Sequence, residues 1–393
     1  KNIAAAAFLC RRASSEGPSS SHLCTRRRAW TTRTLVDGDA HRETRVMLSF
    51  PRVQPSASRV RAPAMNSRQS AKAHRPAAAS PSTSDASVSA YDRDVLIVGP
   101  GVLGSRIASE WLERYPSAVV VGQTNTERAH ETLRLAGVTA RTKDFPSDDP
   151  SAGRSFAYVI FCAPPSGSED YPGELRDALK YWNGRGTFVF TSSSAVYKNE
   201  DGAACDETSE VYDLGESPRV DRLLNAEKVV LDAGGVVCRL AGLYHSQRGA
   251  HKYFIKTPRL DSRADALVNL IHYEDAAELC IAALMSHTKS TVFLGTDGVP
   301  VTREAIARLA VNSGAYDDDA AVPEFTETDG PRGRVMSNDS TRRALNWEPK
   351  YSSFESFMKQ DAARDSYAPA DASKRRRRKW IFPVIQWNPK LPL

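Results

Sequence analysis

Three glycines at a spacing suited to phosphate binding follow a short apolar run. The run covers residues 94–98, and Gly99, Gly101 and Gly104 then form a G-x-G-x-x-G pattern that leads into a helical stretch ending near Tyr115. In this setting the first glycine permits a tight turn, the second lets a pyrophosphate approach the backbone, and the third lets the helix pack close to the strand. The pattern therefore predicts a dinucleotide site.

The start of that helix supplies the groups that bind the phosphates. The backbone N–H groups of Val102, Leu103 and Gly104 stand in its first turn, with the positive end of the helix dipole behind them. The alternative is a glycine-rich turn that binds nothing. The apolar strand before the glycines and the amphipathic pattern after them favour the dinucleotide.

The end of the second expected strand, residues 118–122, indicates which dinucleotide is bound. A site for NAD usually has a carboxylate near this point, which accepts hydrogen bonds from the ribose hydroxyls. Here the strand leads to Thr124 and Asn125, which can donate to a 2′-phosphate, and to Arg128, which can pair with it. We therefore expect NADP. NAD is the alternative because Glu127 adjoins Arg128, and Arg128 can equally lie on a solvated helix face.

Other strand ends complete the expected cofactor site. Asp144, after the third strand, is expected either to contact the adenine or to be a plain loop acid. Ala163, Pro164 and Ser192 stand at the ends of two further strands and are expected to line the dinucleotide. The carboxyl ends of parallel strands meet at one edge of the sheet, and ligands bind there in such folds.

The body of the chain alternates between apolar strand runs and helical patterns. This alternation predicts an α/β fold, a doubly wound parallel sheet with helices on both faces. From about residue 241 the elements become short and are expected to form a small substrate lobe over the carboxyl edge of the sheet. The expected strands cover 94–98, 118–122, 138–141, 157–162, 186–191 and 235–240, and the helices 102–115, 125–136, 172–182 and 217–233.

Charge divides the chain into three parts. Residues 1–90 contain 15 Lys or Arg against 5 Asp or Glu, residues 91–362 contain 30 against 40, and residues 363–393 contain 8 against 2. The overall charge of +6 is thus the sum of two basic tails and an acidic body. An acidic body repels phosphate backbones, so the composition does not favour nucleic acid as a partner.

The two tails are expected to lie outside the folded domain of residues 91–362. Residues 1–90 are rich in Arg and Ser and poor in acid, which is typical of a transit peptide, for the chloroplast first and the mitochondrion second. An ordinary disordered tail is the alternative. The basic residues 374–379 are interpreted as a disordered extension, with a nuclear address or a nucleic-acid patch as the alternative. No apolar run of about 18 residues indicates a membrane span.

The cysteines indicate neither a metal site nor a disulfide. Cys162, Cys238 and Cys280 stand in apolar runs and are expected to be buried thiols, whereas Cys205 is expected to be exposed. The sequence contains no Cys-x-x-Cys pair or Cys/His cluster of the kind that binds zinc.

Four motifs, in order along the chain, carry a family resemblance. They are a strand ending in Ser-Ser-x-x-Val-Tyr at 192–197, Asp206-Glu207-Thr208, Arg239-Leu240, and the Ile-His-x-x-Asp segment at 271–275. With these motifs residues 92–360 resemble the extended short-chain dehydrogenase/reductase superfamily, and within it the sugar-nucleotide epimerase and dehydratase group. The resemblance implies an NAD(P)-binding Rossmann fold and an oxidoreductase or sugar-nucleotide-modifying enzyme that acts on a small molecule.

The resemblance ends at the catalytic pair. The superfamily activates a substrate hydroxyl with Tyr-x-x-x-Lys, in which the Lys lowers the pKa of the Tyr. Anchored on Glu227, which matches a superfamily glutamate, those two positions hold Arg219 and Leu223. Arg does not deprotonate and Leu carries no charge, so the usual proton relay is absent. The chain instead resembles an atypical branch, the YeeZ-type proteins and their plastid relatives, through segments 239–242 and 346–351.

The candidate site residues that remain each have a structural alternative. Ser193 matches the superfamily's catalytic serine and is expected to hold a substrate oxygen or to cap a loop. Tyr197 is expected to replace the missing acid or to be a packed aromatic, and Arg248 lies in a loop where relatives bind anionic substrate groups. His272 is expected to be a structural histidine, and Asp221 and Arg222 a surface ion pair.

Three functions stay open from the sequence. The first is an NADP-dependent oxidoreductase or sugar-nucleotide-modifying enzyme with a non-standard site, which the substrate lobe favours. The second is a non-catalytic dinucleotide-binding redox sensor or assembly factor, which the missing catalytic pair favours. The third is a plastid RNA-associated protein, which the acidic body disfavours. The sequence indicates neither the substrate, nor the direction of the reaction, nor the oligomeric state.

Overall fold

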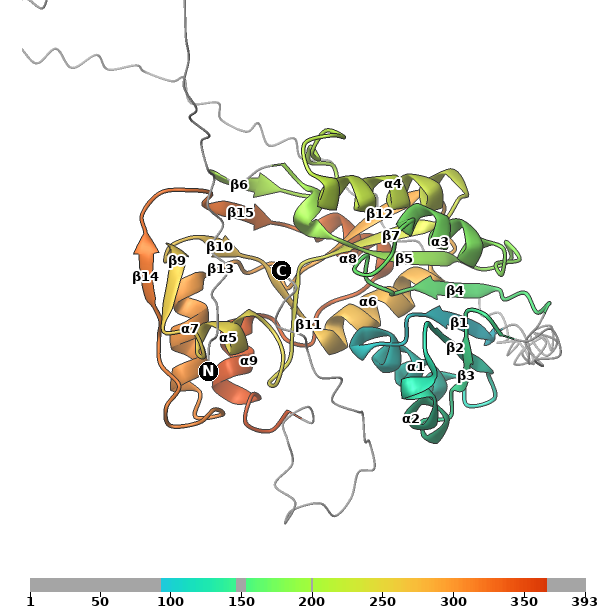
Figure 1. Cartoon of the computed structure of the whole chain (residues 1–393), viewed down its shortest axis with the longest axis horizontal. Helices are drawn as coiled ribbons and strands as arrows, with labels where there is room; N and C mark the ends of the chain where they lie inside the picture. Colours follow the sequence, from blue (N-terminus) through green and yellow to red (C-terminus); the bar gives the residue numbers. More distant parts are fainter. Residues whose placement is uncertain (1–92, 146–152, 199–200, 366–393) are drawn as a thin grey trace, which may run out of the picture. The chain divides into compact units, whose positions relative to one another are not determined.

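The computed structural model of the chain describes residues 93–145, 153–198 and 201–365 (Figure 1). The expected transit peptide of residues 1–90 and the basic segment 374–379 lie outside these described residues.

Parallel strands form a seven-stranded central sheet, in the spatial order β12-β7-β5-β4-β1-β2-β3 (Figure 1). The chain order reverses at β1, which lies between β2 and β4, so that Val98 aligns with Gln123 on one side and with Phe161 on the other. A reversal of this kind opens a crevice at the carboxyl ends of the strands. The strands are β1 (Val95–Val98), β2 (Val120–Thr124), β3 (Thr139–Thr142), β4 (Tyr158–Phe161), β5 (Phe188–Ser193), β7 (Val236–Leu240) and β12 (Thr291–Gly295).

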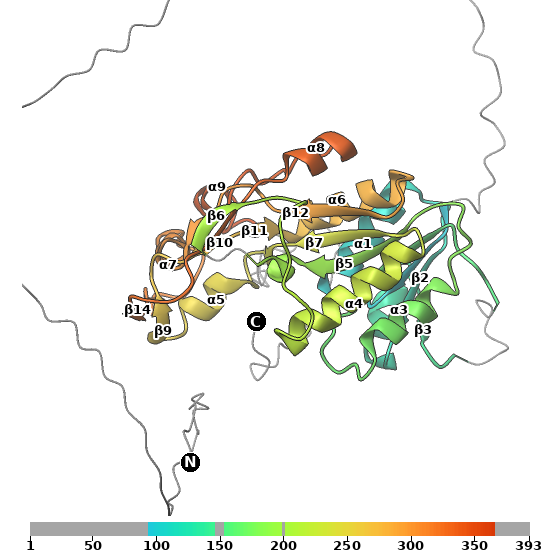
Figure 2. The same cartoon turned by 90° about the horizontal axis from the view of Figure 1, so that it is seen from above.

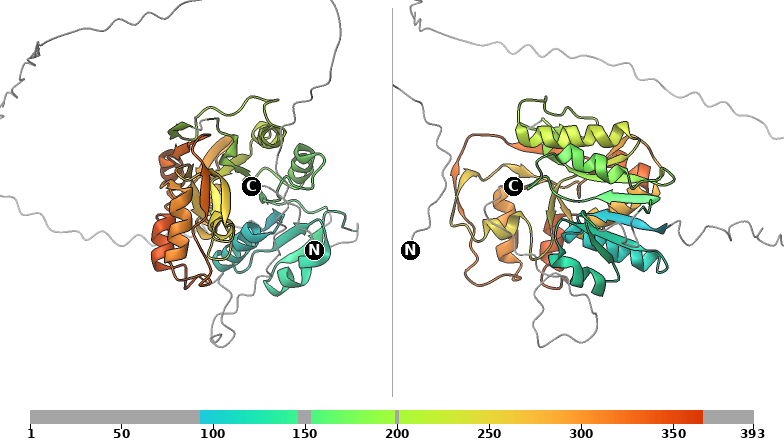
Figure 3. Two further views of the ribbon diagram at one scale, coloured as in Figure 1. Left: turned by 60° about the vertical axis from the view of Figure 1, so that its left-hand side comes forward. Right: turned by 45° about the vertical axis from the view of Figure 1, so that its right-hand side comes forward.

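Helices cover both faces of this sheet (Figures 2 and 3). One face carries α1 (Val102–Arg114) and α6 (Tyr273–Met285), and the other carries α3 (Tyr171–Leu179) and α4 (Pro218–Asp232). The sheet is therefore the middle of three layers, and the predicted doubly wound α/β fold is confirmed.

Strand β1 shows why the sequence of a central strand is uniformly apolar. Val95 and Ile97 join the core beneath α1 and α6, whereas Leu96 and Val98 join the core beneath α3 and α4. Successive side chains of a strand point to opposite faces, so a strand covered on both sides needs an apolar residue at every position. Each fully buried side chain of this size contributes roughly 1.5–3 kcal/mol.

The element boundaries differ from the expected ones where tertiary pairing decides. Strand β2 extends to Thr124, two residues beyond the expected end, because it follows the register of β1. The expected helix over 125–136 is divided into η2 (Glu127–Ala129) and α2 (His130–Leu135). Strand β12 was not expected, and it pairs in parallel with β7 at the edge of the sheet.

Short elements form a small lobe beyond the carboxyl edge of the central sheet. The apolar core of this lobe contains Tyr244, Phe254, Ile306, Phe354 and Phe357. Not every element after residue 241 belongs to it, since α6 and β12 return to the central sheet. The remaining elements are η3 (Ser194–Val196), β6 (Asp201–Cys205), β8 (Gly242–Tyr244), α5 (Ala250–Phe254), β9 (Arg259–Arg263), β10 (Leu267–Val268), β11 (Leu270–His272), β13 (Val301–Thr302), α7 (Arg303–Asn312), β14 (Glu324–Glu327), β15 (Gly333–Met336), α8 (Asp339–Leu345) and α9 (Phe354–Gln360).

The expected exposure of Cys205 is wrong. Strand β6 pairs with β15, and this pairing buries Cys205 in a small apolar cluster with Tyr197, Leu294 and Met336. Cys238 and Cys280 are buried as expected, and Cys162 is partly exposed. Within residues 93–145, 153–198 and 201–365, none of the helices combines the length and the apolar content needed to cross a bilayer.

Candidate functional site

The three glycines of the turn after β1 have three different environments. Gly99 adopts φ +79°, and a Cβ there would lie 2.5 Å from the backbone nitrogen of Ala163. A Cβ on Gly104 would lie 2.8 Å from the carbonyl oxygen of Gly99, so this glycine permits the close approach of α1 to the turn. A Cβ on Gly101 would meet no described atom within 4 Å. The middle glycine thus faces open space, as a backbone that receives a ligand requires.

The first turn of α1 offers donors to this open space. Gly101 is the N-cap residue, none of the described side chains caps the helix, and the first turn contains no acidic residue. Two backbone hydrogen bonds fix the turn: the Gly99 N–H donates to Gln123 O on β2 at 2.9 Å, and the Gly101 N–H donates to Gly99 O at 2.7 Å. The N–H groups of Val102, Leu103 and Gly104 therefore begin a helix that suits an anion.

The tip of β2 brings three of the predicted residues to the surface or near it. Asn125 and Arg128 are exposed, and so is Glu127. Thr124 is partly buried, and its hydroxyl contacts Thr126 O at 2.8 Å and His130 Nε2 at 2.7 Å. The hydroxyl of Thr124 is thus already engaged, so that of the three predicted residues Asn125 and Arg128 have exposed side chains able to meet a phosphate.

Beside this tip, β3 contributes a buried cation that the sequence did not reveal. The Arg141 guanidinium lies 4.2 Å from the ring centroid of Phe145 and 4.6 Å from that of Tyr181. Its Nη2 donates to Gln123 Oε1 at 2.8 Å. Asp144, three residues further on, is exposed and lies at the end of β3 as expected.

The turn after β4 forms the opposite wall of the glycine turn. The Cys162 N–H donates to Val98 O at 2.7 Å, and Ala163 O accepts from the Tyr171 hydroxyl at 2.7 Å. These two bonds hold Ala163 against Gly99, and the exposed Pro164 follows it. Ala163 and Pro164 thus lie next to the predicted phosphate site.

The serines at the end of β5 have separate environments. Ser193 is partly exposed, and its Oγ accepts the Ala195 N–H at 3.2 Å, which caps η3. Ser192 faces the other side of the sheet, is buried, and donates from Oγ to Glu227 Oε1 at 2.5 Å. The hydroxyl of Ser192 is therefore directed into the protein.

Glu227 is the centre of a buried ionic network that sequence reasoning missed. Its carboxylate accepts from Arg239 Nη2 at 2.7 Å, and the Arg239 guanidinium lies 4.8 Å from the ring centroid of Tyr197. Burial raises the pKa of Tyr197 to about 12, although the Arg239 cation opposes the shift. Tyr197 has no exposed surface, which fits the packed-aromatic interpretation better than that of a proton donor.

Helix α4 shows what stands in place of the catalytic pair. Leu223 is buried in the apolar cluster that contains Val196 and Val220, so the lysine position is part of the core. Arg219, at the tyrosine position, is exposed. The Asp221 carboxylate accepts the Gly215 N–H at 3.0 Å, and Arg222 is exposed.

The small lobe contributes two cationic side chains and a structural histidine. Arg248 is partly exposed in the turn after β8, and Arg334 Nη1 donates to Ser194 O at 2.9 Å. His272 is fully buried, accepts the Glu274 N–H on Nδ1 at 3.2 Å, and packs 4.1 Å from the Tyr351 ring centroid. These contacts fit the expected structural role of His272.

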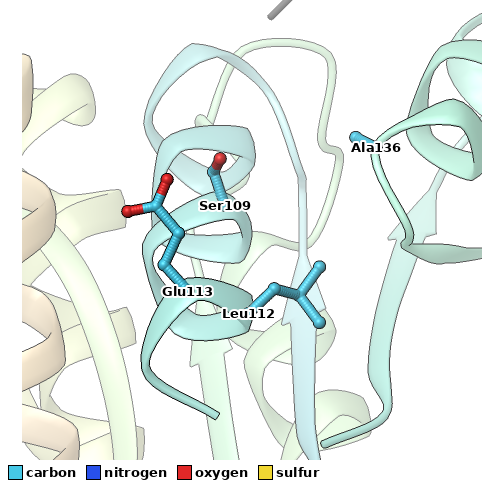
Figure 4. Close-up of a pocket in the computed structure, with 4 residues that line it drawn as sticks. All are labelled: Ser109, Leu112, Glu113 and Ala136. Atoms are coloured by element: carbon cyan, nitrogen blue, oxygen red, sulfur yellow. The ribbon is translucent and has the colours of Figure 1, made fainter. Parts of the chain in front are cut away.

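A separate depression lies between α1 and the end of α2, lined by Ser109, Leu112, Glu113 and Ala136 (Figure 4). Its residues belong to the later turns of α1, away from the glycine turn. Among the residues that the structure describes, no group of three or more His, Cys, Asp or Glu side chains is arranged to hold a metal ion.

Comparisons with known proteins identify the fold. No protein-family model matches the sequence, and no curated protein matches it. A conserved Silicibacter pomeroyi protein of unknown function is 18% identical, with a TM-score of 0.56 over 69% of this chain and 98% of its own. UDP-glucose 4-epimerase from Thermotoga maritima, solved with UDP-glucose, is 17% identical, with a TM-score of 0.53 over 68% and 97%.

A third similar structure is a dTDP-glucose 4,6-dehydratase from Bacillus anthracis in complex with NAD. It is 14% identical, with a TM-score of 0.55 over 68% of this chain and 95% of its own. At such identities the likeness shows the fold alone. The chain shares its Rossmann fold with these epimerase and dehydratase structures, as its motifs predicted.

Proposed function

We propose that this protein binds a nicotinamide dinucleotide over the Gly99–Gly104 turn and acts on a sugar nucleotide. The observation that carries the proposal is the open space above Gly101. The first N–H groups of α1 bind the pyrophosphate there, and Ala163 packs against Gly99 at the start of the same turn. When bound, the nicotinamide supplies the hydride acceptor or donor that the side chains of the protein lack. The enzymes of this fold that were solved with UDP-glucose or NAD support the choice of ligands.

The preferred dinucleotide is NADP. The tip of β2 carries no carboxylate of its own, and the exposed Asn125 and Arg128 can meet a 2′-phosphate. Glu127 lies beside them, and we expect it to permit weaker binding of NAD. A guanidinium forms paired hydrogen bonds with phosphate oxygens, which makes Arg128 the main selectivity residue.

Substrate handling falls to Ser193 and Arg248. The Ser193 hydroxyl accepts one hydrogen bond from Ala195 and retains its own hydrogen to donate to a substrate oxygen. Arg248 meets an anionic group of the substrate. Tyr197 is assigned no catalytic role, because its side chain is fully buried and has no surface from which to meet a substrate.

A second function is favoured by Leu223. The lysine position is filled by an apolar side chain within the core, so the proton relay of the superfamily has no counterpart on α4. A protein of this kind binds the dinucleotide and reports its presence or redox state without turnover.

A thermal-shift panel tests these proposals. The full chain is heated with NADP⁺, NAD⁺ or UDP-glucose, alone and in combination. A ligand that binds the native state raises the melting temperature by mass action. We expect the largest shift with NADP⁺ and a further shift when UDP-glucose is added. A dinucleotide shift without a UDP-glucose shift favours the non-catalytic function, and the absence of any dinucleotide shift contradicts both.

A further inference from the structure

The chain reverses direction in a tight turn directly after β8. His245 and Arg248 exchange two backbone hydrogen bonds, from His245 N–H to Arg248 O at 2.9 Å and from Arg248 N–H to His245 O at 3.0 Å. Ser246 and Gln247 are therefore the central residues of a two-residue turn. The turn ends at Gly249, whose φ of +138° favours glycine.

The backbone of Ser246, in the middle of this turn, is held by three contacts. The Ser246 N–H donates to Asp365 Oδ2 at 2.8 Å. The Ser246 carbonyl oxygen accepts from the Tyr316 hydroxyl at 2.9 Å and contacts His251 Nε2 at 3.3 Å. Ser246 has no exposed surface, so these contacts take the place of water. Two of these contacts, from Asp365 and Tyr316, come from segments distant from the turn in the sequence.

Asp365 itself is fixed by the packing of the residues before it. The Asp275 carboxylate accepts the N–H groups of Lys350 at 2.6 Å and Tyr351 at 3.2 Å, and the Asp297 carboxylate accepts the N–H of Phe354 at 3.2 Å. We call residues 349–365 the C-terminal strap.

Aromatic packing joins the strap to β8. The rings of Phe354 and Phe357 lie 5.0 and 5.3 Å from the ring of Tyr244, the last residue of β8. The strap is thus anchored beside the turn before it reaches Asp365, whose carboxylate is also 3.8 Å from His272 Nε2.

We propose that Asp365 is a positioning residue, which acts through the Ser246 N–H to fix the turn that carries Arg248. The role of Arg248 rests on the proposed function, whereas the contact between Asp365 and Ser246 stands without it. Loss of the carboxylate leaves a buried N–H without its acceptor, and the turn must then shift to satisfy it. The strap therefore takes part in substrate recognition through Asp365.

Calorimetric titration of the full chain with UDP-glucose, in the presence of saturating NADP⁺, tests this role. We expect Asp365→Ala to weaken UDP-glucose binding about tenfold, in line with the cost of an unpaired buried donor. Asp365→Asn keeps an acceptor oxygen and should restore most of the affinity. Asp361→Ala, in the same strap, is the matched control and should bind as the wild type does.

The double variant separates positioning from a general structural effect. In an Arg248→Ala background, Asp365→Ala should cause no further loss, because the group that it positions is gone. An equal loss in both backgrounds, or no loss in the single variant, overturns the proposal.

Amide hydrogen exchange tests the contact between Asp365 and the Ser246 N–H, which we call the clamp, without any ligand. Residues 244–250 should exchange faster in Asp365→Ala, but not in Asp365→Asn or Asp361→Ala. Unchanged exchange in Asp365→Ala overturns the clamp. If Arg248→Ala binds UDP-glucose as the wild type does, the proposed role of Arg248 in substrate binding is wrong. Faster exchange in Asp365→Ala would still support the clamp.

Discussion

Ser192 and Glu227 are joined by a hydrogen bond of 2.5 Å between the end of β5 and the middle of α4. The same carboxylate accepts a hydrogen bond from the Arg239 guanidinium on β7. Strands β5 and β7 and helix α4 therefore meet at one buried carboxylate. The side chains of Arg239 and Glu227 are only 9% and 2% exposed. Such a pair holds its elements in a fixed arrangement as long as both partners are present.

Removal of one partner should therefore destabilise the protein strongly. Arg239→Met leaves the Glu227 carboxylate buried without its cation, and we expect a loss of about 3–5 kcal/mol in the free energy of unfolding. Urea unfolding followed by circular dichroism measures the change. The control is Lys228→Met, which breaks an exposed pair with Asp232 on the same helix and should cost less than about 1 kcal/mol. Equal losses in the two variants would contradict the network.

Glu110 on α1 should make the protein less stable at alkaline pH. Burial raises the pKa of Glu110 to about 8, the nearby Glu278 adds to the rise, and Arg106 opposes it. Because the folded pKa lies above the unfolded one, the contribution of this group is present below about pH 4.5 and is lost as the pH rises toward 8.

The variant Glu110→Gln tests this pH dependence. Relative to it, the wild type should lose on the order of 3 kcal/mol between pH 4.5 and pH 8. Glu113→Gln, on the exposed side of the same helix, is the control and should follow the wild type. Parallel stability curves for wild type and Glu110→Gln across this range would argue against a buried protonated carboxyl.

The contribution of His251 to stability should have the opposite pH dependence, with a loss at acid pH. Burial lowers the pKa of His251 to about 4, so its contribution to stability is present above pH 6.5 and is lost as the pH falls toward 4. His251→Gln retains a donor for Ser246 O, and it should reduce the acid-induced loss by on the order of 2–3 kcal/mol. Chemical denaturation at several pH values measures this. His287→Asn, at an exposed site, should leave the acid response unchanged.

Arg128 should decide between NADP and NAD. Arg128→Ala removes the cation expected to pair with the 2′-phosphate, and we expect NADP⁺ affinity to fall about tenfold while NAD⁺ affinity stays unchanged. Calorimetric titration with each dinucleotide measures the ratio. Arg134→Ala, an exposed cation on the following helix, is the control. An equal loss for both dinucleotides would show that Arg128 does not read the phosphate.

The first strand, glycine turn and helix could be predicted from the sequence because their signals are local. The apolar run, the three glycines and the helix start are contiguous, and the structure gives each glycine the environment that its position implies. The sequence also suggested the structural alternatives for Ser193 and Tyr197, because a serine at a strand end often caps a loop and an aromatic residue is often packed in a core. The structure adds a hydrogen bond for the first and complete burial for the second.

Features that depend on distant pairing could not be predicted. Strand β12 joins β7 across about 55 residues of chain, and β15 buries Cys205 from more than a hundred residues away. The contact of Asp365 with Ser246 likewise joins two segments whose local sequences contain no sign of it. Short-range periodicity reports which face of an element is apolar, but not which partner covers it.

The central claim is that the space above Gly101 receives a pyrophosphate, and titration of Gly101→Leu with NADP⁺ tests it most directly. The backbone at Gly101 has φ −76°, and a Cβ there meets no described atom within 4 Å, so the variant should fold with an unchanged melting temperature. Its leucine side chain should fill the space and abolish NADP⁺ binding. A variant that folds and binds NADP⁺ with wild-type affinity would contradict the account.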